Sequence, residues 1–430
     1  MSKLNILILH RLGPVHLAPL FLQRHVFSLK TYFPEHNYIY HDAHLPAPEY
    51  IKDASFDAII LDVTFLCARW AGETVYNKIR AGFAFVRDSD AVKIAFPQDE
   101  YDCHRILDDW MCDWNVDVLY SVISSNWSLL YPRFHQVGEI KLGYTGYIDE
   151  EIIKIAPKPF INRSVDVGYR ARKLAPYFGR VGEVKWSIGT AFSNEAKKFS
   201  LKTDIVLGDE GTLLGRSWLD FINDCKFTLG ANSGSSLLDP YGDIQRKVRS
   251  YIADNPRADF SEVEENCFKG GDGLHAFTAI SPRVFEAGLL ESCQILVRGD
   301  YSHVISPWEH YIPIEDDASD FSVVFEAMKD TVLVDRLRRN CREALLSFDG
   351  LRAIEASRKV IELILAYKIR RNISSNTVLI NRLIIKYNNE MVPAYLGYWR
   401  RQLLKQRFSV ALKKFPLIDS LARAVHAKLV

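Results

Sequence analysis

The segment with the clearest potential for chemistry is a run of small polar residues that follows an apolar stretch. It reads Lys226-Phe-Thr-Leu-Gly-Ala-Asn-Ser-Gly-Ser-Ser-Leu-Leu-Asp-Pro240. The backbone amides and hydroxyls of such a loop can hold an anion, for example a phosphate or a carboxylate. We expect this role of Ser233, Gly234, Ser235 and Ser236. A serine and glycine turn after a strand also occurs for purely structural reasons, so its function depends on its surroundings.

A second candidate element is a helix that begins at Ser281 and Pro282, residue types favoured at the N-cap and the first helical position. Arg283 and Glu286 are three positions apart and share one face of its first turn. The helix N-terminus and Arg283 suit a phosphate, and the Glu286 carboxylate can hold a ribose diol. A capped helix with an ordinary ion pair is the alternative interpretation.

Basic residues near two other predicted strands are further candidates. Arg170 and Arg172 alternate along one strand, and arginine binds phosphate or carboxylate through paired hydrogen bonds. His275 follows a glycine-rich segment that starts at Lys269, and it is a candidate proton donor. Solvated or paired arginines and a structural histidine are the alternatives.

Two acidic residues leave a predicted strand end in the first half of the chain. Either Asp99 or Glu100 is a candidate base toward a hydroxyl group, although acids at strand ends also cap helices. The pair Asp316-Asp317 falls in a predicted surface loop, and no D-x-D motif lies at a predicted strand end. We therefore expect no metal site and a reaction independent of metal ions.

Several common catalytic motifs are absent from the sequence. There is no G-x-x-x-x-G-K-[ST], no G-x-G-x-x-G after the first strand, no G-x-S-x-G and no H-E-x-x-H. These absences disfavour nucleoside triphosphatases, ordinary dehydrogenases, serine hydrolases and zincin proteases.

The elements that position the candidates follow an α/β pattern. Short β-branched runs alternate with helical stretches, which is typical of parallel sheets with crossover helices. The predicted strands are Leu4–Leu9, Ala58–Val63, Val92–Phe96, Val116–Ile123, Ser164–Tyr169, Thr203–Leu207, Lys226–Leu229 and Cys293–Val297. Amphipathic helices are predicted over Phe321–Ser347 and Leu351–Arg371.

A predicted linker divides the chain into two α/β units. Asp149–Arg163 contains Pro157 and Pro159 and separates two sets of strands. We expect one unit over residues 1–150, a second over 164–350, and C-terminal helices with a basic tail over 351–430. Ligands bind at the carboxyl ends of parallel strands, so the cleft between the two units is the expected site.

Composition sets the remaining limits. The 430 residues are 48% hydrophobic and carry a formal charge of +1, which indicates a globular chain and argues against a general nucleic-acid binder. This small net charge is the sum of two opposite charges: Trp399–Val430 carries a formal charge of +7, and the rest of the chain carries −6. Aromatic and basic residues over Tyr395–Leu412 suit an anionic membrane surface, or a helix that leads into a further domain.

The sequence also bears on the expected compartment. No apolar run approaches the length of about 20 residues that a spanning helix needs, and no cleavage site follows the first apolar stretch. The seven cysteines are scattered without a C-x-x-C pair. These features predict a cytoplasmic protein with reduced thiols.

The helix Ser281-Pro-Arg-Val-Phe-Glu-Ala287 resembles the donor-nucleotide helix of GT-B glycosyltransferases, which have two Rossmann-like domains. The common retaining GT-B families place a second Glu eight positions after the first, and this chain has Gln294 there. The departure argues against a standard sugar-diphosphate hexosyltransferase.

Four segments together show a more specific resemblance. They are Gln98-Asp-Glu-Tyr101, Val167-Gly-Tyr-Arg-Ala-Arg172, the Leu229–Pro240 loop and Pro307-Trp-Glu-His-Tyr-Ile-Pro313. They resemble the retaining β-Kdo transferase domain of WbbB-type O-antigen enzymes, glycosyltransferase family 99, over most of residues 1–400. The resemblance implies a modified GT-B fold, CMP-β-Kdo as donor, and a lipid-linked O-antigen saccharide of lipopolysaccharide as acceptor. It also implies work at the inner face of the bacterial inner membrane, with further glycosyltransferase domains as possible neighbours in a longer polypeptide.

In that family a carboxylate in the serine-rich loop attacks the anomeric carbon, and the acceptor hydroxyl then displaces it with retention. The matching residue here is Asn232, whose amide is a poor nucleophile, so the resemblance predicts an inactivated variant. It places Tyr169 beside the donor with the residues named above, and Gln98, Tyr101 and His310 beside the acceptor. The alternatives are a GT-B enzyme that uses another nucleotide sugar and a catalytically silent glycan-binding or assembly module.

Overall fold

The computed structural model describes residues 3–213 and 215–413. The first unit is built on a parallel sheet of six strands in the order β2-β1-β3-β4-β5-β6. Its strands are β1 (Asn5–His10), β2 (Asn37–Asp42), β3 (Ala58–Leu61), β4 (Val92–Ala95), β5 (Val118–Ser121) and β6 (Glu139–Leu142). β1, β3 and β4 are buried along their whole length, because helices cover both faces of the sheet.

Most helices of the first unit are short, and α1, α4 and α6 are the longer ones. They are α1 (Leu20–Tyr32), α2 (Glu49–Lys52), α3 (Val63–Leu66), α4 (Glu73–Gly82), α5 (Phe85–Asp88), α6 (His104–Asp113), α7 (Trp127–Leu130), α8 (Phe134–Val137) and α9 (Glu150–Ile153). The predicted linker therefore contains two short helical segments, α9, whose N-cap is Asp149, and a 3-10 turn at Phe160–Asn162.

The second unit has a parallel sheet in the order β13-β12-β9-β7-β8. Its strands are β7 (Val165–Ala171), β8 (Thr203–Leu207), β9 (Cys225–Gly230), β12 (Cys293–Val297) and β13 (Ile312–Ile314), and a separate antiparallel pair joins β10 (Ser233–Ser235) to β11 (Phe277–Ala279). Its helices are α10 (Gly179–Lys198), α11 (Arg216–Asp224), α12 (Asp243–Asp254), α13 (Phe260–Cys267), α14 (Pro282–Leu289), α15 (Phe321–Lys329) and α16 (Thr331–Ser347).

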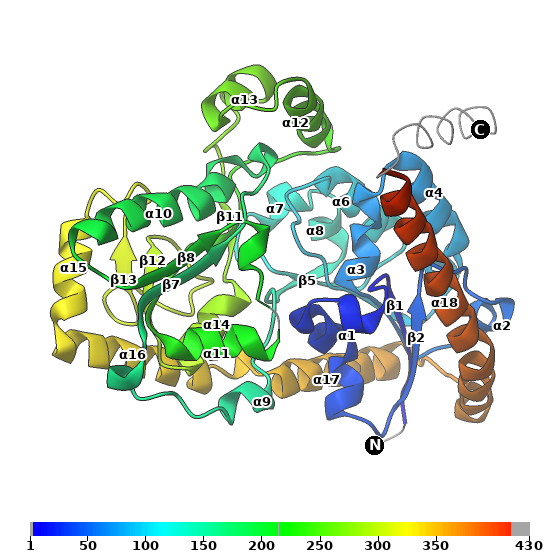
Figure 1. Cartoon of the computed structure of the whole chain (residues 1–430). Helices are drawn as coiled ribbons and strands as arrows, with labels where there is room; N and C mark the ends of the chain where they lie inside the picture. Colours follow the sequence, from blue (N-terminus) through cyan, green and yellow to red (C-terminus); the bar gives the residue numbers. More distant parts are fainter. Residues whose placement is uncertain (1–2, 214, 414–430) are drawn as a thin grey trace.

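The last two helices return to the first unit. α17 (Ala353–Arg371) packs against α1 and β4 of the first unit, and α18 (Thr377–Lys413) lies beside β2 (Figure 1). Val360 and Ile364 of α17 share a buried cluster with β1, while Ile380 and Leu383 of α18 belong to the main core of the first unit. Two Rossmann-like sheets with C-terminal helices confirm the predicted α/β class of GT-B type.

All eight predicted strands are present. The strands that were not predicted are the edge strands β2, β6 and β13 and the separate pair β10 and β11: β6 alternates with polar residues, β2 has polar residues at both ends, and the other three are only three residues long. The predicted helix Phe321–Ser347 is two helices, α15 and α16. Asp330 separates them, since its carboxylate caps α16 by accepting hydrogen bonds from two backbone amides.

Loops at the carboxyl edges of both sheets hold the units together. The amide of Asp239 donates to the carbonyl of Tyr101 at 2.9 Å, and the hydroxyl of Thr145 donates to the carbonyl of Ile280 at 2.6 Å. The buried side chain of Phe277 in β11 belongs to the core cluster of the first unit. The β10–β11 pair is therefore part of the junction between the units.

Within residues 3–213 and 215–413, no helix is long and apolar enough to cross a membrane. The predicted basic tail falls partly on α18, and its residues 414–430 lie outside the described part of the chain.

Candidate active-site cleft

At the junction of the two units lies a lysine, Lys185, that sequence analysis did not single out. The ammonium group of Lys185, on α10, donates a hydrogen bond to the hydroxyl of Ser233 at 3.1 Å. Burial lowers the pKa of Lys185 to about 8, while Asp99 from the first unit raises it and Arg283 lowers it further. The lysine, the acid and the arginine therefore act on one another across the boundary between the units.

Asn232 lies between β9 and β10, where the units meet. Its amide nitrogen donates to the carbonyl oxygen of Asp300 at 2.9 Å, and its buried amide oxygen has no partner among the described residues. The carboxylate of Asp300 in turn accepts from the hydroxyl of Ser124 in the first unit at 3.4 Å. The position that the resemblance assigns to the nucleophile is thus anchored at the junction.

The other residues of the serine loop hold the loop itself together. Ser235 is fully buried and bonds to the backbone of Leu237, and Ser236 donates to the carboxylate of Asp272. Gly234 has φ of 137°, and a Cβ there would lie 1.9 Å from the carbonyl oxygen of Phe277, so no larger residue fits. Of the loop hydroxyls, that of Ser233 is the one directed at Lys185.

The predicted donor helix is α14, with Ser281 at the N-cap and Pro282 at the first position, although the Ser281 side chain makes no capping bond. Arg283 lies over the ring of Trp218 at 5.2 Å. The indole nitrogen of Trp218 donates to one carboxylate oxygen of Glu286 at 2.6 Å. Burial raises the pKa of Glu286, although the bond from Trp218 and the charge of Arg283 oppose that rise.

The three candidate residues at β7 and just after it, Tyr169, Arg170 and Arg172, contact different parts of the second unit. The hydroxyl of Tyr169 donates to the backbone carbonyl of Lys185 at 2.8 Å. This bond links β7 to the turn of α10 that carries the lysine. Arg170 pairs with Asp204 at 2.9 Å, and exposed Arg172 pairs with Asp209 at 2.9 Å. Both guanidinium groups are thus engaged with acids near β8.

Three further predicted residues make their contacts with residues other than Lys185. Lys269 is exposed and pairs with Glu265 of α13. His275 is partly buried, and the centroid of its ring lies 5.4 Å from that of Phe277, with the two rings tilted. His310 precedes β13 and receives a hydrogen bond from the amide of Ser306 at 2.9 Å, so it lies at the amino edge of the second sheet.

The loop after β4 brings together the acidic candidates. Asp99, with a left-handed φ of 48°, accepts from the hydroxyl of Tyr101 at 2.6 Å. Gln98 donates to the carbonyl of Thr145 at 3.3 Å. The carbonyls of this loop are held by the buried side chain of Arg69.

Glu100 is completely buried inside the first unit and does not reach the cleft. Its two oxygens accept from the hydroxyl of Tyr131 at 2.6 Å and from the amide of Val122 at 2.9 Å. Burial raises the pKa of Glu100 to about 7. Because its oxygens are engaged in the core, Glu100 is a structural residue, and Asp99 is the acid whose charge acts on Lys185.

Lys185 carries no local signal in the sequence, since a single lysine in a long amphipathic helix is typical of a solvated surface residue. Only its approach to Ser233 and Asp99 distinguishes it. In the described part of the chain, no group of His, Cys, Asp and Glu side chains is arranged to hold a metal ion.

Comparison with known proteins finds no matching family model and no matching curated protein sequence. Solved structures that resemble the chain are glycosyltransferases. An α-glucosyltransferase solved with UDP and a 13-mer DNA has 11% identity and a TM-score of 0.46 over 85% of this chain and 100% of its own. Anabaena HepE with UDP and glucose has 9% identity and a TM-score of 0.49 over 85% of this chain and 100% of its own. A Rickettsia africae glycosyltransferase has 10% identity and a TM-score of 0.38, over 85% and 99% of the two chains.

Proposed function

We propose that the chain is a glycosyltransferase that takes Kdo from CMP-β-Kdo and transfers it to an O-antigen saccharide. The observation that carries the proposal is the contact of Lys185 with Ser233 at the carboxyl edge of the second sheet, where the charge of Arg283 also acts on Lys185. CMP-Kdo brings two anionic groups, a phosphate and a sugar carboxylate. Two cations from separate helices suit two anions, because each can neutralise one charge.

Glu286 and α14 suit the nucleoside part of the donor. One carboxylate oxygen of Glu286 is held by Trp218, and the other, which has no hydrogen-bond partner among residues 3–213 and 215–413, can accept from a ribose diol. Lys185 and Arg283 supply the positive charge needed as the phosphate leaves, and we propose that the reaction requires no metal ion. Loss of transfer in EDTA that Mg²⁺ restores would contradict this part of the proposal.

The retaining step depends on residue 232. In the proposed double displacement, a carboxylate there attacks the anomeric carbon and CMP leaves; the acceptor hydroxyl then displaces the carboxylate. The amide of Asn232 cannot form that ester. In an Asn232→Asp protein the carboxylate can no longer donate to the carbonyl of Asp300, and repulsion turns it toward the cleft.

The test is intact mass spectrometry of the Asn232→Asp protein after exposure to CMP-β-Kdo. A mass increase of one Kdo residue, absent from the unaltered chain, is the expected result. Asn223→Asp, which changes a partly exposed asparagine in α11, is the matched control and should acquire no adduct. Failure of Asn232→Asp to gain an adduct or CMP release would remove residue 232 from the mechanism.

The nucleotide is tested separately on the unaltered chain. CMP is expected to raise the melting temperature more than UDP or GDP at equal concentration, because ligands that bind only the folded state stabilise it. A larger shift with UDP or GDP would favour a GT-B enzyme with another nucleotide sugar.

A catalytically silent glycan-binding module is the second candidate, favoured by the amide at position 232. It predicts saccharide binding with no gain of turnover in Asn232→Asp.

We further propose attachment to the inner face of the bacterial inner membrane through α18, where exposed Leu396, Leu403 and Leu404 lie near exposed Arg400 and Arg401.

A further inference from the structure

The first unit carries an exposed apolar segment between β1 and α1, over residues 14–21, which we call the apolar loop. Its four large apolar side chains are exposed to solvent, and Leu17, at 61%, is the most exposed of them. The other three are Val15, Leu20 and Phe21. Large apolar side chains that gather at a surface are typical of a site that binds a protein or a membrane.

The apolar loop is an ordered turn. A 3-10 turn over Val15–Leu17 follows Pro14, and the amide of Leu17 donates to the carbonyl of Pro14 at 2.9 Å. The side chain of Gln23 on α1 donates to the carbonyl of Ala18 at 2.8 Å. These bonds satisfy backbone groups of the loop locally, so its apolar side chains are left to face solvent.

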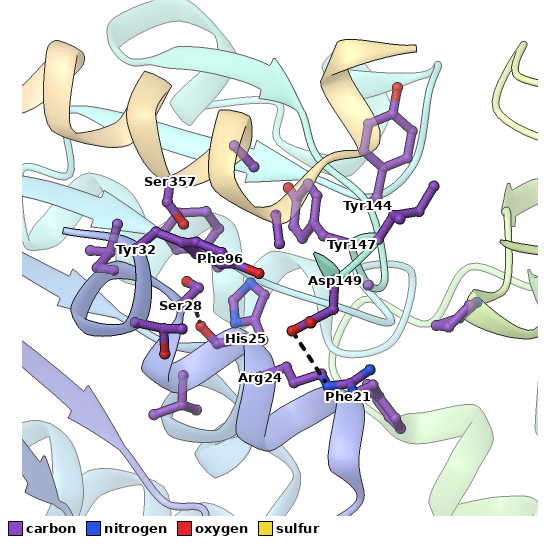
Figure 2. Close-up of a pocket in the computed structure, with 18 of the residues that line it drawn as sticks. Phe21, Arg24, His25, Ser28, Tyr32, Phe96, Tyr144, Tyr147, Asp149 and Ser357 are labelled. Atoms are coloured by element: carbon purple, nitrogen blue, oxygen red, sulfur yellow. Dashed lines mark hydrogen bonds and ion pairs between the residues drawn. The ribbon is translucent and has the colours of Figure 1, made fainter. Parts of the chain in front are cut away.

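α1 carries the second half of the apolar loop, and an ion pair anchors this helix. The guanidinium group of Arg24 lies 3.6 Å from the carboxylate of Asp149, which caps α9. Figure 2 shows Phe21 beside Arg24 at one side of a cavity of about 310 Å³. Leu20 and Phe21 contribute to the wall of this cavity and are also exposed. The start of α1 is therefore fixed to the body of the first unit.

The end of α18 lies beside the apolar loop. Gly13, the residue before the loop, is so close to the indole ring of Trp399 that an added Cβ would lie 3.4 Å from it. Leu396 and Leu403 are three and four positions from Trp399, which places them on neighbouring turns of the same side, and both are exposed. Arg400 is exposed as well. The two apolar groups are therefore neighbours at the surface of the first unit.

Both segments are free of acidic residues. The first acidic residue of the chain is Glu35, and none lies between Glu390 and Asp419. Residues 1–34 contain four Lys or Arg, and residues 391–418 contain six. An apolar surface with basic neighbours matches a bilayer that contains anionic lipids. A second copy of the chain matches it less well, because two such surfaces would bring like charges together.

We propose that the apolar loop inserts into the interface of an anionic bilayer, beside the basic end of α18. The inference deepens the proposed function, because it rests on the proposed attachment through α18 and adds a separate apolar contact from the first unit. Leu17 and Phe21 enter the boundary between headgroups and acyl chains, and Arg400 lies near the lipid phosphates. A single helix on the membrane leaves the body free to rotate about the helix axis, and a second contact restricts that rotation.

The first test is sedimentation with vesicles of phosphatidylglycerol and phosphatidylcholine. Leu17→Ser with Phe21→Ser should reduce binding about 10-fold or more, because binding strength follows the apolar area that is buried. Val323→Ser with Val332→Ser is the matched control, since these two apolar residues are exposed on the second unit. It should leave binding unchanged. The melting temperature and its increase with CMP check that each variant is folded.

Salt separates the apolar contact from attraction between charges. High salt screens the attraction of basic residues to lipid phosphates and leaves apolar insertion intact. The ratio of binding between the unaltered chain and Leu17→Ser with Phe21→Ser should therefore persist at high salt. The corresponding ratio for Arg400→Glu with Arg401→Glu should shrink. A ratio for the loop variant that also disappears at high salt overturns insertion.

A tryptophan probe reports insertion directly. Leu17→Trp adds one indole to the apolar loop, and its fluorescence should be quenched by vesicles whose acyl chains carry bromine. Val332→Trp, at an exposed position of the second unit, is the control and should show no added quenching. Equal quenching of the two added indoles overturns the proposal.

The outcomes separate this inference from the proposals on which it rests. Unchanged vesicle binding by Leu17→Ser with Phe21→Ser overturns insertion of the loop and leaves attachment through α18 standing. Absence of vesicle binding by the unaltered chain overturns both. A dimer in solution that the loop variant loses, without any vesicle binding, also overturns the proposal and gives the surface to a second copy. Glycosyl transfer is tested without vesicles by the Kdo adduct, so its failure is seen separately.

Discussion

The ammonium group of Lys185 lies 3.1 Å from the hydroxyl of Ser233, and it comes from a helix whose sequence gives no sign of a binding role. The contact joins α10 to the β10–β11 pair at the edge where the two units meet. It places one positive charge beside the loop that carries Asn232. The first prediction concerns that charge.

Lys185→Met should weaken binding of CMP about 10-fold or more, since a hydrogen bond to a charged group contributes about 1.5–3 kcal/mol. The pKa of about 8 means that the free lysine loses its charge as pH rises through that value. Affinity of the unaltered chain for CMP should therefore fall between pH 7 and pH 9, and Lys185→Met should not show this fall. Titration calorimetry measures both, and exposed Lys197→Met on the same helix is the control.

Glu286→Ala should remove discrimination between CMP and 2′-deoxy-CMP. The free oxygen of Glu286 is proposed to accept from the ribose diol, so the unaltered chain should prefer CMP by about 10-fold. Trp218→Phe should reduce this preference in part, because the carboxylate loses the indole donor at 2.6 Å while the ring under Arg283 remains. Equal affinities for both nucleotides in the unaltered chain would contradict the assignment of Glu286.

Glu100→Gln should change how stability depends on pH. The folded pKa of about 7 lies above the ordinary value of 4.5, so folding favours the protonated acid. The stabilisation that this group contributes is complete below about pH 4.5 and is lost as pH rises through about 7. The free energy of unfolding, from urea titrations, should fall from pH 5 to pH 8 by about 2–3 kcal/mol more in the unaltered chain than in Glu100→Gln.

The control for that comparison is Glu151→Gln, since Glu151 is exposed on α9. It should follow the unaltered chain at both pH values. The Glu100→Gln substitution places a side-chain amide beside the backbone amide of Val122. Its free-energy cost is the same at pH 5 and pH 8, so it cancels in the difference. Parallel curves for Glu100→Gln and the unaltered chain would show that Glu100 does not titrate in this range.

Charge reversal on α18 should weaken attachment to anionic membranes. Each basic residue near such a surface contributes about 1 kcal/mol, so Arg400→Glu with Arg401→Glu should reduce binding to phosphatidylglycerol vesicles by at least about 10-fold at low salt. High salt should weaken binding of the unaltered chain as well. Sedimentation with vesicles measures this, with exposed Arg382→Glu on the same helix as control. Equal binding to neutral phosphatidylcholine vesicles would contradict attachment through charge.

The positions of the main strands were predictable because they are apolar on both faces. β1, β3 and β4 contain few polar residues and match their predicted ranges to within one or two residues. β6 reads Glu-Ile-Lys-Leu and is partly exposed at the sheet edge, so its pattern resembles a loop or a short helix. Burial on both sides leaves a strong periodic signal, whereas an edge strand has only one side to bury.

The candidate site was predictable only where its residues are neighbours in sequence. Ser281, Arg283 and Glu286 lie on one turn of α14, as their spacing indicated. Arg170 has the residue type expected of an anion site, but the fold turns it toward Asp204 and Phe221. Residue type limits what a side chain can bind, and neighbouring elements decide what it does bind.

The sequence by itself determined two parallel-sheet units, the turn at Gly234 and the helix that starts at Pro282, because each depends on local periodicity or backbone conformation. The tertiary structure alone decided that Lys185 meets Ser233 and that Glu100 is buried. These residues come from separate elements, and their charges acquire altered pKa values only when folding removes water from around them. Desolvation and the approach of distant groups are properties of the packed chain, and no local pattern encodes them.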